Sequence, residues 1–229
     1  MKHAACSSIP VVLAILTAIS APQNTLCVYA QNFCAVFERF PFKHVEISII
    51  PSASNRVVCD EEHGYLMVRT QATTGRTLEI AFVSFHADDG TIYYAYQEII
   101  SQKQSPCRRA SLRFYVCDGD EWREVTYQVL PSVRISEFYG QRTVPNVIDS
   151  RGVMSLTPDD NAQGIGLGID YTLPRKGEPI MHATLVYRCN DATPKKEYQQ
   201  LYRSCKYKTI ELLWNKENGW FLIGSKRAE

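Results

Sequence analysis

The sequence predicts an all-β fold, an antiparallel sandwich of two sheets that is stabilised by disulfide bonds and has at most one short helix. After residue 42, apolar and polar residues alternate with a period of two in most segments. This period places successive side chains on opposite faces of a strand. The segments are short and are separated by Gly, Pro, Asn or Asp, which favour turns. Short strands with one apolar face bury that face when one sheet packs on another.

The alternating segments are spread along the chain. Strands are predicted at residues 44–50, 77–85, 91–99, 110–116, 124–130, 133–139, 183–189, 206–214 and 220–224. The Asp89-Gly90 turn predicts a hairpin between the second and third of these strands, and the turn at 215–219 predicts another between the last two. Residues 194–204 form either the one short helix or a loop.

Residues 31–229 are predicted to form a single sandwich domain, in which 140–180 is the least regular part. This part is rich in Gly and Pro, and it fits either a linker or a long loop that carries binding residues. Within it, "GIGLGID" (164–170) alternates Gly with large apolar residues. In a strand, this pattern leaves one face bare, so that another backbone or a ring can approach closely. The bare face serves either core packing or a binding surface.

The N-terminus has the features of a secretory signal peptide. Lys2 precedes an apolar run at 9–19, and small residues follow it. The run is too short to span a bilayer, which takes about 20 residues. We therefore expect residues 1–30 to be a signal peptide and the mature chain to be secreted and extracellular. Cleavage after residue 20 or 21 and cleavage after Ala30 both fit the sequence.

The number of cysteines depends on that cleavage position. Cleavage after Ala30 leaves six, which we expect to form structural disulfides: Cys34, Cys59, Cys107, Cys117, Cys189 and Cys205. Earlier cleavage adds Cys27 as a seventh, whereas an oxidising compartment favours an even number.

The strand prediction restricts how the six cysteines pair. Cys107 and Cys117 bracket one predicted strand, whose ends are about 33 Å apart at about 3.3 Å per residue. A disulfide needs Cα atoms within about 4.4–6.8 Å, so each of these two cysteines is expected to pair elsewhere. The simplest pairs are Cys34 with Cys59 and Cys189 with Cys205. If both form, no other cysteine of the six remains as a distant partner for Cys107 or Cys117, so the Cys34–Cys59 pair competes with that need.

Charge and motifs exclude several classes of function. Without Lys2 the chain has 24 basic and 24 acidic residues, and no charge block indicates a nucleic-acid or membrane partner. No nucleophile elbow, EF-hand loop or zinc-type cysteine spacing occurs. The histidines of the expected mature chain lie near predicted strands or turns in no catalytic pattern: His44, His63, His86 and His182. We therefore expect no cofactor, no metal and no enzymatic activity.

Exposed aromatic residues are the expected means of recognition. The chain has 13 tyrosines, and strand alternation places several of them on outward faces, namely Tyr93, Tyr115, Tyr127 and Tyr139. Tyrosines on rigid strands suit protein or sugar binding, and they also suit aromatic pairs between neighbouring strands.

The first half of the chain resembles a known family. Cys34, "VEISI" (45–49), Cys59, "GRTLEIAF" (75–82), "DGTIYYAYQ" (89–97) and the cysteine-bracketed strand "CRRASLRFYVC" (107–117) occur in this order. Over residues 34–120 this resembles the secreted poxvirus immune-evasion β-sandwich, the fold of the viral chemokine-binding proteins. The resemblance implies capture of a host extracellular protein. It transfers no binding residues, and the neutral charge departs from the acidic members that bind chemokines.

The second half offers an alternative. "HATLVYRCND" and "LYRSCKYKTIELLW", within 182–214, are similar to the end of mannose-6-phosphate-receptor-homology lectin domains. Those domains need a glutamate where this chain has Leu201, and their final cysteine is missing here. The sequence thus predicts a secreted, non-enzymatic binding protein for an extracellular partner, with a lectin-like module as the alternative and an enzyme as a third hypothesis.

Overall fold

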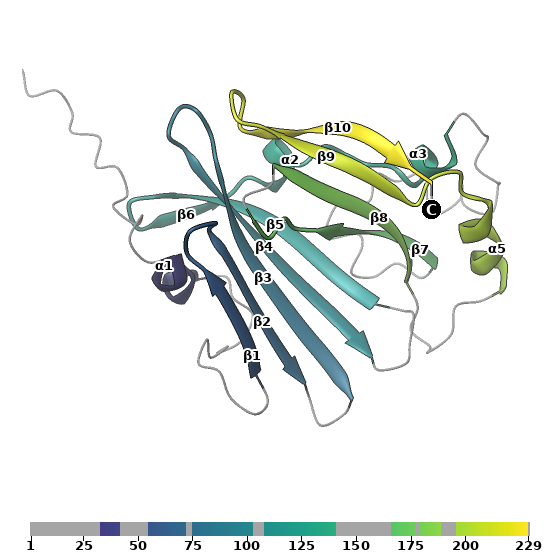
Figure 1. Ribbon diagram of the computed structural model, residues 1–229, viewed down its shortest axis with the longest axis horizontal. Coiled ribbons are helices and arrows are strands. Elements are labelled where there is room, and N and C mark those ends of the chain that lie inside the picture. The colour runs from purple at the N-terminus through teal and green to yellow at the C-terminus, as the bar shows by residue number, and fades with distance from the viewer. Residues whose placement is uncertain are drawn as a thin grey trace, which may run out of the picture.

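The computed structural model describes residues 33–41, 55–71, 75–102, 108–140, 166–176, 179–188 and 196–228. These residues form two antiparallel sheets, one of six strands in the order β1-β2-β3-β4-β5-β6 and one of four in the order β10-β9-β8-β7. The smaller sheet packs across the larger one (Figure 1). The predicted two-sheet, all-β architecture is therefore confirmed. The predicted strand at 44–50 lies outside the described residues.

The six-stranded sheet is a meander in which each strand pairs with the next along the chain. Its strands are β1 (Asn55–Asp60), β2 (Tyr65–Gln71), β3 (Arg76–His86), β4 (Ile92–Gln102), β5 (Arg108–Asp118) and β6 (Glu121–Glu124). The hairpin predicted at Asp89-Gly90 is confirmed, with Phe85 opposite Tyr93. β5 is one continuous strand across 108–118, as the cysteine argument assumed.

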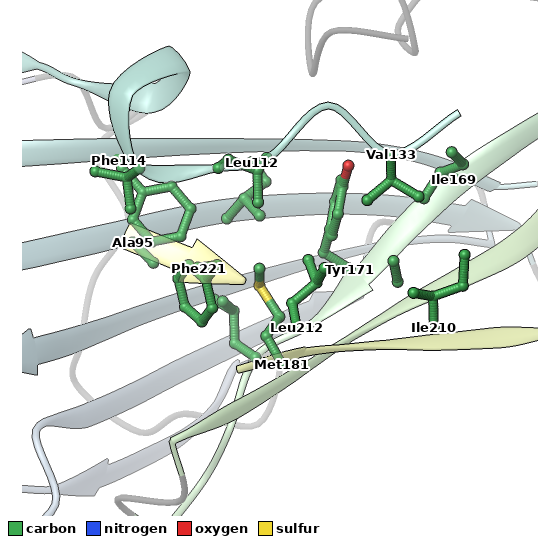
Figure 2. Close-up of a cluster of buried hydrophobic side chains, with 14 of the residues drawn as sticks. Ala95, Leu112, Phe114, Val133, Ile169, Tyr171, Met181, Ile210, Leu212 and Phe221 are labelled. Carbon is green, nitrogen blue, oxygen red and sulfur yellow. The ribbon is translucent and has the colours of Figure 1, made fainter. Parts of the chain in front are cut away.

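The four-stranded sheet contains the C-terminal half. Its strands are β7 (Gly166–Thr172), β8 (Ile180–Arg188), β9 (Thr209–Asn215) and β10 (Trp220–Arg227). β7 lies inside the part that was expected to be irregular, and residues 141–165 before it lie outside the described residues. Ile169 and Tyr171 of β7 are buried in the core between the sheets (Figure 2), so that at least this face of the "GIGLGID" strand serves core packing.

The described residues also contain four short helices: α1 (Phe33–Arg39), α2 (Thr126–Val129), α3 (Ile135–Tyr139) and α5 (Lys196–Ser204). The expectation of at most one helix was wrong, and so were the strands predicted at 124–130 and 133–139. Val125, which directly precedes α2, and Val129 of α2 are buried, and Tyr127 between them is exposed. This spacing of four suits a helix as well as a strand. Residues 194–204, for which a helix and a loop both fitted the sequence, contain the helix α5. None of the described helices has the length and hydrophobicity needed to cross a lipid bilayer.

The core lies between the two sheets. Leu112 and Phe114 of β5 point inward and meet Leu212 and Phe221 of the smaller sheet (Figure 2). Phe114 and Phe221 have ring centroids 5.7 Å apart. Burying each large apolar side chain of this kind contributes about 1.5–3 kcal/mol, so that this layer provides the main attraction between the sheets.

A second apolar cluster covers the other face of the larger sheet. Phe37 of α1 and Phe40, which directly follows the helix, contact Phe82 of β3, with ring centroids 5.3 and 5.2 Å apart. Phe40 also meets Tyr115 at 4.9 Å. The expected outward tyrosines are therefore mostly covered: Tyr115 and Tyr139 are buried, Tyr93 is partly buried, and only Tyr127 of the four is exposed. The prediction was wrong for Tyr115 because α1 packs over the face that alternation assigns to solvent.

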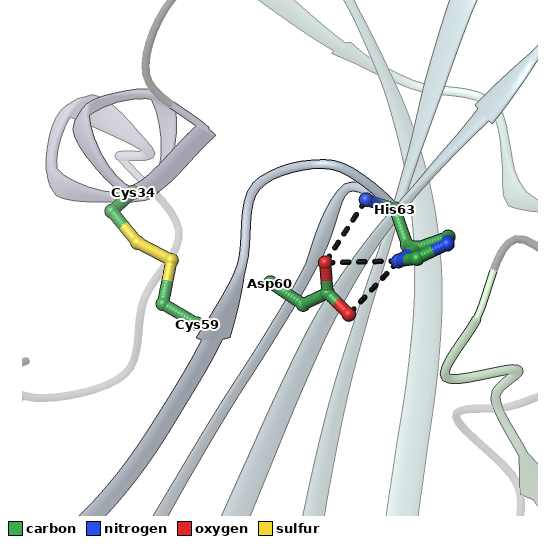
Figure 3. The surroundings of a disulfide bond; sticks show 4 residues. All are labelled: Cys34, Cys59, Asp60 and His63. Atoms are coloured by element: carbon green, nitrogen blue, oxygen red, sulfur yellow. Dashed lines mark hydrogen bonds and ion pairs between the residues drawn. A yellow bond between two sulfur atoms is a disulfide. The ribbon is translucent and has the colours of Figure 1, made fainter.

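A disulfide bond joins α1 to the larger sheet. Cys34 of α1 is bonded to Cys59 of β1 across a separation of 25 residues (Figure 3). This is one of the two pairings that the sequence favoured, and it excludes Cys34 and Cys59 as partners for Cys107 and Cys117. The bond fastens the helix to the sheet whose outer face it covers.

Candidate binding edge at strand β10

The hairpin of β9 and β10 forms one border of the smaller sheet. Its strands face each other in regular register, with Phe221 opposite Trp214 and Leu222 opposite Leu213. Phe221 and Trp214 point into the core, where their ring centroids are 5.1 Å apart. Because neighbours along a strand point to opposite faces, Leu213, Trp220 and Leu222 lie on the outer face of the sheet.

These outer residues are unusually accessible for large apolar side chains. Trp220 is 43% exposed, Leu222 47% and Leu213 39%. Together with Ile223, at 41%, they are four of the seven exposed large hydrophobic residues in the described part of the chain, so that exposed apolar surface is concentrated on one hairpin. We call Leu213, Trp220, Leu222 and Ile223 the β10 edge. Contiguous exposed apolar residues mark interaction sites more often than isolated ones do.

Three members of the β10 edge, Trp220, Leu222 and Ile223, expose apolar side chains on both faces of β10. Trp220 and Leu222 are on the outer face, whereas Ile223 lies opposite the buried Leu212 and so belongs to the core side. β10 is the outermost strand of its sheet, and no described strand pairs with the side away from β9. A strand added to that side would cover residues of both faces, whereas a partner on the outer face alone would leave Ile223 in water.

A bulge ends the regular part of this edge. The register between β9 and β10 shifts between Ile223 and Lys226, and such bulges limit how far an edge strand can pair. The part of the edge with regular geometry is therefore Trp220–Ile223, which coincides with the exposed apolar residues.

Charged groups beyond the bulge are neutralised within the chain. Ser225 and Arg227 both donate hydrogen bonds to the carboxylate of Glu211, and Lys226 contacts Glu137 of α3 at 3.2 Å. The hydrogen bond from Ser225 and, after it, the charge of Arg227 hold the pKa of Glu211 below its usual value. The apolar residues are thus followed by a polar network that is already satisfied.

The structure places the predicted cysteines at several sites. Cys34 and Cys59 form the disulfide already described. Cys107 and Cys189 lie outside the described residues, so the disulfide bonds expected for each of them stay predictions. The Cys117 thiol donates a hydrogen bond to the Gly119 carbonyl at 3.2 Å. Cys205 is buried beside Tyr139, and burial raises the pKa of its thiol.

A metal site is not formed by the described cysteine cluster. Cys34, Cys59 and Glu61 place their ligand atoms within 4.8 Å of one another. The two sulfur atoms are bonded to each other, and a metal needs them as thiolates. This cluster is therefore structural.

Sequence reasoning did not single out the β10 edge. A signal existed in "WFLI" (220–223), four large apolar residues in succession. A strand with one buried face can bury only alternate residues of such a run, so at least two must meet solvent or a partner. Only the structure shows that the strand is at the border of its sheet.

Comparisons with known proteins give little further guidance. No protein-family description and no curated protein matches the chain. A solved structure of a domain of an uncharacterized protein from Porphyromonas gingivalis W83 is similar, at 16% identity and a TM-score of 0.44, over 76% of this chain and 81% of that one.

Proposed function

We propose that this chain is a secreted, non-enzymatic binding protein that captures an extracellular protein of a host, and that it acts as a virulence or immune-evasion factor. Its partner contributes an extended segment that adds a strand to the β10 edge. The observation that carries this proposal is the exposure of Trp220, Leu222 and Ile223 on both faces of one border strand. The signal-like N-terminus and the family resemblance of residues 34–120 support export and the class of partner.

Strand addition suits these residues in energy and geometry. An added strand gains backbone hydrogen bonds along an edge, and side-chain contacts on either face provide specificity. Tryptophan is enriched among the residues that dominate binding energy. The partner segment is therefore expected to carry apolar side chains opposite Trp220–Ile223 and to have no proline there, since proline cannot contribute a hydrogen bond to the ladder.

The experiment is capture followed by direct binding. The mature protein is used to recover partners from host extracellular fluid, which are identified by mass spectrometry and purified. Their affinity is then measured for the wild type and for Trp220→Lys and Leu222→Lys. Because loss of a dominant contact costs about 2 kcal/mol or more, we expect each variant to weaken binding at least about 30-fold.

The matched control is Val58→Lys. Val58 is 37% exposed on β1, the border strand of the other sheet, so this change adds the same charge to a comparable edge. It should leave the affinity unchanged. Equal weakening by Val58→Lys, or a recovered partner that binds Trp220→Lys as tightly as wild type, would contradict the proposed edge. Absence of a protein partner together with selective binding on a glycan array would instead favour the lectin-like alternative.

A further inference from the structure

A second site lies where the two sheets meet at one end of the sandwich. A cleft of about 370 Å³ opens there between the β1–β2 turn, the end of β3 and the end of β9. This volume is within the range of about 300–1,000 Å³ that is typical of small-molecule sites. The cleft shares no residue with the β10 edge, so that its ligand is a separate question from the proposed protein partner.

Aromatic side chains form the apolar part of the cleft. Phe85 and Trp214 line it from opposite sheets, with ring centroids 5.3 Å apart. The indole of Trp214 is held in place, because its Nε1–H donates a hydrogen bond to the His86 carbonyl at 2.9 Å. Phe33 and Tyr94, whose ring centroids are 6.5 Å apart, also line the cleft. Several rings of fixed orientation suit a flat, ring-shaped ligand.

Acidic groups border the cleft on the side of the larger sheet. Glu61 and Glu62, both exposed, line it from the β1–β2 turn. The turn is held by its neighbours: Asp60 accepts hydrogen bonds from the backbone N–H of His63 at 3.2 Å and from its ring Nδ1 at 3.0 Å (Figure 3). No ion pair joins Glu61 or Glu62 to another described residue, which leaves two carboxylates available to a cationic group.

One cationic group borders the cleft on the side of the smaller sheet. Lys216, exposed in the β9–β10 turn, lines it, and the Lys216 backbone carbonyl accepts a hydrogen bond from Asp88 N–H at 2.9 Å. Lys216 also lies close enough to His86 to help burial lower the pKa of that imidazole. His86 is therefore neutral at pH 7, and Lys216 is the cation that lines the cleft on this side.

The geometry points to a small aromatic zwitterion as the ligand of this cleft, either an aromatic amino acid or a short peptide with an aromatic residue. Its ring packs against Phe85 and Trp214 where they line the cleft, its ammonium group meets Glu61 and Glu62, and its carboxylate meets Lys216. Each polar end then has a partner of opposite charge, and the ring is removed from water. A ligand with only one of the two charges leaves one border of the cleft without a partner.

The test compares three indole compounds by isothermal titration calorimetry on the full protein. L-tryptophan carries both charges, tryptamine lacks the carboxylate, and indole-3-propionate lacks the amine. We expect L-tryptophan to bind at least tenfold tighter than either of the others. Glu61→Gln with Glu62→Gln should weaken L-tryptophan and tryptamine only, whereas Lys216→Met should weaken L-tryptophan and indole-3-propionate only.

Control variants separate this site from other effects. Glu217→Gln removes an exposed carboxylate next to Lys216 that does not line the cleft, and it should bind L-tryptophan like the wild type. Trp220→Lys should do so as well, since the two sites are separate. The inference is overturned by absence of saturable L-tryptophan binding at millimolar concentration, by equal affinity for the three compounds, or by charge variants that leave all affinities unchanged in folded protein.

Discussion

Arg108 of β5 and Asp170 of β7 form an ion pair that joins the two sheets of the sandwich. The two partners differ in their access to water, because the side chain of Asp170 is 1% exposed and that of Arg108 is 35% exposed. A buried carboxylate depends on a nearby cation, whereas the partly exposed side chain of Arg108 can be hydrated. The pair therefore makes the stability of the fold depend unequally on its two members.

The first prediction follows from that difference. Arg108→Ala removes the cation beside a buried carboxylate and should lower the free energy of unfolding by about 3–5 kcal/mol. Asp170→Asn leaves a partly hydrated arginine and should cost about 1–2 kcal/mol. Urea denaturation measures both. A larger loss for Asp170→Asn than for Arg108→Ala would contradict this assignment.

The second prediction concerns the disulfide that fastens α1. The chain-entropy relation gives about 3.5 kcal/mol for a loop of the 25-residue separation between Cys34 and Cys59. The double variant Cys34→Ser with Cys59→Ser should lose a comparable part of the free energy of unfolding, measured by urea denaturation. Val58→Ala, a change at the exposed residue beside Cys59, is the control and should stay within about 0.5 kcal/mol of wild type. A free energy of unfolding of the double cysteine variant equal to that of Val58→Ala would show that the disulfide bond is dispensable.

The third prediction separates steric overlap from backbone strain at two glycines. Gly64 has φ +57°, and a Cβ there would lie 1.9 Å from the Ser84 hydroxyl oxygen. Gly75 has φ +74° with nothing within 4 Å of such a Cβ. Gly75→Ala should cost about 1–2 kcal/mol from the left-handed conformation alone, and Gly64→Ala should cost clearly more. The midpoint of thermal unfolding should be lower for Gly64→Ala than for Gly75→Ala. The reverse order would contradict a steric overlap at Gly64.

The fourth prediction is a pH dependence that arises from His86. Burial, and then the charge of Lys216, lower the pKa of His86 in the folded protein, while the unfolded chain takes up this proton near pH 6.5. The unfolded state thus binds more protons between pH 6.5 and the lowered value, and stability falls as the pH drops through that window. His86→Gln should reduce the fall between pH 7.5 and 5.5, measured by urea denaturation. The contribution of Glu211, whose pKa is also lowered, is lost only at more acidic pH.

Much of the fold could be predicted because strand periodicity is a local property. The hairpin at Asp89-Gly90, the strand of Leu112 and Phe114, and the hairpin at 215–219 all appear as expected. The helix α2 was missed because Val125 and Val129 satisfy either period over so short a segment. The candidate sites were not predicted, since Trp220 and Glu61 each become part of a site only through neighbours that are distant in sequence.

The pattern of residues along the chain is enough to predict short antiparallel strands with apolar faces, and these faces require a second layer. It also restricted the cysteines, because a strand of ten residues holds its ends apart. Which faces are covered depends on the packing of distant segments: Phe40, just after α1, packs on the buried Tyr115, whereas the border position of β10 leaves Trp220 and Leu222 in water. The alternation of apolar and polar residues along a strand indicates to which side of the sheet each side chain points. What packs on that side depends on chain segments that local patterns do not describe.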